Sequence, residues 1–130
     1  MKYFTIEELC DSATAKAEKI DNKPSRAVVE ALEALVYNVL DPLREAYGKP
    51  IYVNSGYRSP RLNLVVGGAG KSQHLRGEAA DITTGTKEGN KWLYNYIFRH
   101  LPYDQLINEE DYSWVHVSYT ATDTNRQHAW

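Results

Sequence analysis

Apolar residues follow a helical period in the first part of the chain. Between residues 20 and 50, valines and leucines recur at spacings of three, four and one, which places them on one helical face. Pro42 lies inside this pattern and predicts a kink or a division of the helix. Thr5 precedes Glu8 by three residues, a capping-box spacing, so a short helix is expected in "FTIEELC". Shorter helical patterns cover residues 59–66 and 86–101.

Strand patterns dominate the second part of the chain. Residues 51–59 predict a strand that runs into a turn, residues 77–83 predict a second strand, and residues 103–119 predict a hairpin. The tail, about residues 120–130, is polar and without periodicity, so we expect it to be irregular. Helices come first and strands later. We therefore predict one α+β domain over residues 1–130, with N-terminal helices packed on a small antiparallel sheet.

Composition excludes several classes of function. The chain has 130 residues, 42% of them hydrophobic and 25% charged, which fits one globular domain with a real core. A formal net charge of −2 argues against a nucleic-acid-binding or membrane-surface protein. The single cysteine, Cys10, excludes an intramolecular disulfide and a cysteine-based zinc site. We find no signal peptide, expect synthesis in the cytoplasm, and expect a monomer.

Two histidines and an aspartate are candidate metal ligands. His74 and Asp81 stand seven positions apart in "GKSQHLRGEAADI", and His116 lies within the predicted strand "SWVHVSY". Side chains alternate along a strand, so Val115 and Val117 can face the core while His116 faces a cleft. Two imidazoles and one carboxylate can hold zinc and leave a fourth position for water. As an alternative, the histidines are structural hydrogen-bonding residues and the aspartate caps a turn.

The motifs around these residues resemble those of the zinc D-Ala-D-Ala carboxypeptidase family, in the hedgehog/DD-peptidase fold group. The similarity runs from "FTIEELC" to about Tyr119. The family motif S-x-H-x-x-G-x-A-x-D is matched by Ser72, His74, Gly77, Ala79 and Asp81. The resemblance implies a cell-wall peptidase with one zinc ion, whose ligands are His74, Asp81 and His116.

Several further residues are candidates for contact with substrate. Arg58, in "SGYRS", is either a surface arginine or, as the resemblance implies, a residue that grips a substrate carboxylate or polarises the scissile carbonyl. Guanidinium suits this role because it stays charged and bonds bidentately. Ser72 and Gln73 could contact the peptide, although Ser72 could simply cap a turn. Tyr57 and Trp114 could line the cleft, with core packing as the alternative for Tyr57.

The general base departs from the family pattern. Several relatives place a glutamate three residues before the last histidine ligand, where this chain has Ser113, and others place a histidine where it has Trp114. "DQLINE" is similar to the family's D-Q-L-I-x-E, so we take Glu109 as the base. The alternatives are a solvated acidic turn or its other acids, Glu110 and Asp111. Asp104 could orient a ligand histidine instead.

The sequence therefore predicts a zinc metallopeptidase that hydrolyses amide bonds of peptidoglycan stem peptides containing D-alanine, as a carboxypeptidase or an endolysin-type endopeptidase. Glu109 would carry the proton and Arg58 would bind the substrate. Without a signal peptide, we expect a phage-type release to bring it to the cell wall. One rival is a non-catalytic zinc domain that binds peptidoglycan. The other is a structural phage component whose histidines are simply packed.

Overall fold

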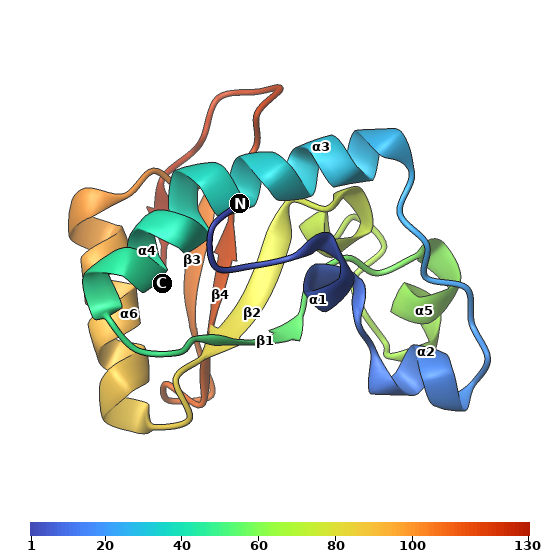
Figure 1. Ribbon diagram of the computed structural model, residues 1–130, viewed down its shortest axis with the longest axis horizontal. Coiled ribbons are helices and arrows are strands. Elements are labelled where there is room, and N and C mark those ends of the chain that lie inside the picture. The colour runs from blue at the N-terminus through green and yellow to red at the C-terminus, as the bar shows by residue number, and fades with distance from the viewer.

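The computed structural model describes all 130 residues and has the expected α+β fold, in which helices border a five-stranded sheet (Figure 1). The α-helices are α1 (Ile6–Cys10), α2 (Ala13–Ala17), α3 (Arg26–Leu35), α4 (Asp41–Tyr47), α5 (Pro60–Val65) and α6 (Lys87–His100). A π-helical turn, η1 (Val36–Leu40), and a 3₁₀ turn, η2 (Gln73–Arg76), complete the helical segments. The strands are β1 (Tyr52–Ser55), β2 (Ala79–Thr83), β3 (Gln105–Glu109), β4 (Trp114–Ser118) and β5 (His128–Ala129). None of the helices combines the length and apolar character that crossing a membrane requires.

Helices α1, α3 and α4 form where the sequence predicts them, whereas α2 was not predicted. The Thr5 hydroxyl accepts a hydrogen bond from the Glu8 amide at 3.1 Å, which caps α1. The predicted break at Pro42 is a π-helical turn between α3 and α4. Proline has no amide hydrogen and its ring crowds the carbonyl four residues back, so the helix widens before it and then continues.

The sheet separates the core from a polar face. Its strand order is β1-β2-β4-β3-β5. The core side carries buried residues of the central strands: Ala80, Ile82, Leu106, Val115 and Val117. Because side chains alternate, Asp81, His116 and Ile107 point to the opposite face. There Asp81 pairs with His116 across β2 and β4, and His116 pairs with Ile107 across β4 and β3. The alternation predicted for the strand of His116 is confirmed.

The tail is more ordered than its polar sequence suggests. Residues 128–129 form β5, which pairs in parallel with β3, so the expectation of an irregular tail is wrong for these residues. The ladder continues to the last residue, because the Trp130 amide donates to the Leu106 carbonyl at 2.9 Å. Arg126 fixes the start of this segment, since its guanidinium donates to both oxygens of buried Asp104, at 3.0 and 2.8 Å. This contact is invisible in the sequence because 22 residues separate its partners.

Docking of the tail is expected to weaken at acid pH. Hydrogen bonds from Arg126 hold the pKa of Asp104 below its usual value. As the pH falls, Asp104 is therefore protonated in the unfolded chain before it is protonated in the folded protein. The contribution of Asp104 to stability is complete above about pH 4, the unfolded-state pKa, and is lost as the pH falls through the lower folded-state pKa. NMR signals of the amides of residues 128–130 should report undocking as the pH is lowered.

The control for this prediction is a matched pair of substitutions. Asp104→Asn should undock the tail at neutral pH and lower the free energy of unfolding by about 1–2 kcal/mol. Asp11→Asn removes a carboxylate from an exposed pair with Lys16 and should leave the tail signals unchanged. A tail that stays docked in Asp104→Asn at every pH would contradict the role given to Asp104.

Candidate metal centre

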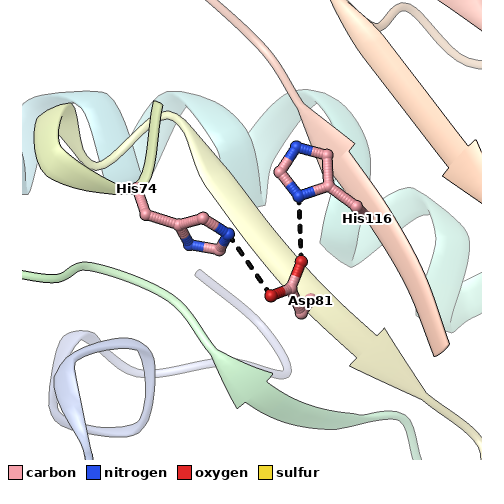
Figure 2. Close-up of side chains that lie close together, drawn as sticks. All are labelled: His74, Asp81 and His116. Carbon is pink, nitrogen blue, oxygen red and sulfur yellow. Dashed lines mark hydrogen bonds and ion pairs between the residues drawn. The ribbon is translucent and has the colours of Figure 1, made fainter. Parts of the chain in front are cut away.

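The three candidate metal ligands converge, although they come from three separate elements. His74 lies in η2, Asp81 in β2 and His116 in β4. One ligand atom from each lies within 4.8 Å of the others. Figure 2 shows both imidazole rings turned toward the Asp81 carboxylate. His116 Nδ1 lies 2.9 Å from Asp81 Oδ1, and His74 Nε2 lies 3.3 Å from Asp81 Oδ2.

Backbone contacts determine which nitrogen of His74 faces the centre. His74 Nδ1 lies 2.6 Å from the Gly56 carbonyl oxygen. A carbonyl only accepts, so Nδ1 carries the hydrogen and Nε2 keeps its lone pair toward Asp81. The Arg58 amide donates to the His74 carbonyl at 3.0 Å, which ties the same two segments together a second time. His74 is therefore fixed in ring orientation and tautomer, as a metal-ligating histidine requires.

The turn that carries His74 needs a cap and a glycine. The Ser72 hydroxyl accepts a hydrogen bond from the His74 amide at 3.2 Å, so Ser72 caps η2. Gly77 ends η2 with φ at 72°, and a Cβ there would lie 2.8 Å from the Val28 carbonyl oxygen. Both the left-handed backbone and the close approach to α3 exclude larger residues.

The electrostatics of the centre favour an ionised carboxylate. Burial raises the pKa of Asp81, but the neighbouring His116 and His74 side chains outweigh burial and hold this pKa well below its usual range. Burial lowers the pKa of Arg58, and the Asp81 carboxylate opposes that shift. The guanidinium nevertheless stays protonated at any ordinary pH. Arg58 Nη2 lies 4.0 Å from Asp81 Oδ2, so one positive and one negative charge share the site.

This donor set fits a divalent metal ion such as zinc. Two imidazole nitrogens and a carboxylate oxygen are the ligands of catalytic zinc sites with three protein donors. His74 and His116 each direct one nitrogen at the carboxylate, so all three donors lie close together. All three line a cleft of about 1170 Å³, so the donors are reachable from solvent.

Most of the predicted substrate-contacting residues line the same cleft. They are Arg58, Ser72, Gln73 and Trp114. Tyr57 is not among the lining residues: its side chain belongs to the hydrophobic core and is only 8% exposed. The structure thus favours the alternative that the sequence left open for Tyr57, core packing, over its predicted contact with substrate.

Among the acids of the hairpin, only Glu109 lines the cleft. It is half-buried at the end of β3 and pairs with Trp114, diagonally across the ladder from His116. Residues 110–112 all have left-handed backbones, with φ of 45°, 54° and 64°, so the chain turns away directly after Glu109. Glu110 and Asp111 are exposed around a separate pocket, where Asp111 pairs with Lys87. This placement favours Glu109 over the two alternatives.

Asp104 does not orient a ligand histidine. Its carboxylate is occupied by the backbone amide and guanidinium of Arg126, and no hydrogen bond joins it to His74 or His116. The alternative role considered for Asp104 is therefore wrong. It lies directly before β3, where its carboxylate contacts the tail.

Comparison with known proteins agrees with this geometry. The model of the family described as Peptidase M15 matches residues 2–118. The chain belongs to the Peptidase M15 family. The family resemblance carried by the motifs is thus confirmed. This M15 chain is also similar to the zinc D-Ala-D-Ala carboxypeptidase of Streptomyces albus G, with 42% identity over 66 residues. The matched region covers 50% of this chain and 26% of that relative, so the chain spans about a quarter of the relative's length.

The motifs missed one group of residues that lines this M15 cleft and one buried residue behind it. Tail residues form one wall of the cleft: Thr120, Thr122, Asp123, Thr124 and Arg126. Their sequence offers no period or motif that places them there. Asn63 is the second omission, since it is buried in α5 and contacts Arg58. Its signal was a polar residue of low helix propensity between apolar neighbours in a short helix.

Proposed function

We propose that this chain is a zinc metallopeptidase that hydrolyses amide bonds in peptidoglycan stem peptides. The observation that carries the proposal is the convergence of His74, Asp81 and His116 on one point of an open cleft. Membership of a peptidase family supports hydrolysis. The name of the Streptomyces albus G relative supports both zinc and a D-alanine-containing substrate.

The residues around the centre have different proposed roles in hydrolysis. A bound zinc ion would polarise the scissile carbonyl and lower the pKa of water toward neutrality. Glu109 is the proposed general base and acid, which takes a proton from the attacking water and passes it to the leaving amine. Its support is its position in the cleft, on the same face of the sheet as His116. Arg58 is the proposed substrate-binding residue.

The charge of the site favours a substrate with a carboxylate. Asp81 and Arg58 balance one another, so a divalent cation would make the centre net positive. The Arg58 guanidinium can bind a carboxylate beside that cation with a charge-assisted hydrogen bond. The cleft volume of about 1170 Å³ exceeds that of a typical small-molecule pocket, which supports a peptide longer than the scissile dipeptide.

The test is hydrolysis of a defined stem peptide that ends in D-Ala-D-Ala, together with purified peptidoglycan. The protein should release free D-alanine or new amino groups, a chelator should stop the release, and added zinc should restore it. Free D-alanine from the peptide indicates a carboxypeptidase, whereas new amino groups in cross-linked peptidoglycan indicate an endopeptidase. Peptide binding without turnover would favour the non-catalytic domain, and a protein without stoichiometric zinc would favour the structural phage component. Phage-type release to the wall stays a prediction.

A further inference from the structure

The guanidinium of Arg58 is held from behind by two polar side chains. Its Nε–H donates to the Ser55 hydroxyl at 3.2 Å, and its Nη1 donates to Asn63 Oδ1 at 3.0 Å. Its Nη2 is the nitrogen that approaches Asp81. The side chain of Arg58 is only 15% exposed. Nε and Nη1 are therefore both engaged, and Nη2 is the nitrogen presented to the metal centre.

Asn63 is itself locked in place. It lies in α5 and is 5% exposed. Its amide nitrogen donates to the Ala69 carbonyl at 2.9 Å, and its backbone carbonyl accepts from the Gly68 amide at 2.8 Å. Guanidinium only donates and a carbonyl only accepts, so the orientation of the Asn63 amide follows from its two partners. Asn63 thus joins Arg58 to the loop at residues 66–70.

Gly68 leaves the space that this contact needs. A Cβ at position 68 would lie 2.0 Å from Asn63 Oδ1 and 2.4 Å from Arg58 Nη1. Real Cβ atoms do not approach other atoms so closely, so any side chain there would push Arg58 and Asn63 apart. Gly70, in the same loop, has nothing within 4 Å of the equivalent point. Of Gly68 and Gly70, only Gly68 therefore needs the absence of a side chain for lack of space.

We propose that Asn63 and Gly68 are positioning residues that set the orientation of Arg58 and thereby the affinity for a substrate carboxylate. This inference rests on the proposed role of Arg58 in binding substrate. An arginine side chain has several rotatable bonds, and ordering it at the moment of binding costs affinity. Contacts that order it beforehand remove that cost and aim Nη2 at the substrate. Their loss should raise KM more than it lowers kcat.

The first experiment compares two identical substitutions in one loop. Gly68→Ala should raise KM for a peptide ending in D-Ala-D-Ala by about 10- to 100-fold, the range expected for a charged hydrogen bond. Gly70→Ala should keep the wild-type kcat and KM because no atom lies within 4 Å of the added Cβ. Both proteins should bind one zinc ion, since neither position belongs to the candidate ligand set. Gly68→Ala with the kinetic constants of Gly70→Ala would overturn the proposal.

A double-substitution series then separates positioning from general stability. If Asn63 acts through Arg58, Asn63→Ala should raise KM in the wild-type background. The same substitution should not raise KM further in an Arg58→Ala protein. If Asn63 has a purely structural role, the increases in KM of the two single variants should multiply in the double variant. Thermal unfolding of each variant identifies any that fail to fold, and Gly68→Ala in the Arg58→Ala background repeats the test at a second position.

A spectroscopic measurement decides the proposal even if the chain hydrolyses nothing. The Nε–H of Arg58 should give a distinct, slowly exchanging NMR signal in the wild type and in Gly70→Ala. In Asn63→Ala and Gly68→Ala the signal should broaden or move to the chemical shift of a solvent-exposed arginine. An unchanged signal in both variants would refute the positioning role. Absence of turnover in the wild type would instead refute the proposed function and leave this measurement to decide the proposal.

Discussion

The His116→Ala protein is expected to purify without stoichiometric zinc and to hydrolyse stem peptides no faster than the uncatalysed background. Removal of His116 leaves one imidazole and one carboxylate, which is one donor too few for a catalytic zinc site with three protein ligands. Metal analysis and release of D-alanine measure the two effects. A chelator should lower the thermal unfolding temperature of the wild type, because a metal that binds only the folded state stabilises it, and should not affect the variant.

The matched control is His100→Ala. His100 ends α6, is exposed, and lies against Tyr96 outside the cleft. The same loss of an imidazole there should leave zinc content and turnover unchanged. Full zinc occupancy in His116→Ala would exclude His116 from the ligand set and with it the proposed centre.

Glu109→Gln is expected to retain zinc and peptide binding and to lose about 10²- to 10⁴-fold in kcat. The amide has nearly the shape of the carboxylate but cannot take a proton from water. The loss should therefore appear in kcat rather than in KM. Steady-state hydrolysis of a peptide ending in D-Ala-D-Ala, with zinc content measured on the same sample, is the test.

Neighbouring acids provide the controls for this second prediction. Glu110→Gln and Asp111→Asn change the same chemical group one and two residues later, on exposed side chains outside the cleft. Both should keep wild-type kcat. If Glu109→Gln also keeps wild-type turnover, no carboxylate of this hairpin carries the proton. Zinc binding without turnover in the wild type itself would support the non-catalytic domain.

The sequence determined those features that depend on local chemistry. Thr5 predicted a capped helix, Pro42 a break, and Val115 with Val117 the buried side of β4, and each is confirmed because neighbours along the chain decide it. The motif around His74 and Asp81 identified the family for the same reason. Its ligands occupy one turn and the strand that directly follows it.

Only the tertiary structure decided how distant segments meet. The left-handed turn after Glu109 leaves that acid in the cleft and directs the next two to solvent, although the sequence makes all three equivalent carboxylates. Asp104 binds Arg126 rather than a histidine, and the tail becomes a strand and a wall of the cleft. The buried contact of Asn63 with Arg58 depends on the fold of the loop at Gly68. Such pairings leave no period along the chain, because their geometry exists only once the helices and strands have packed.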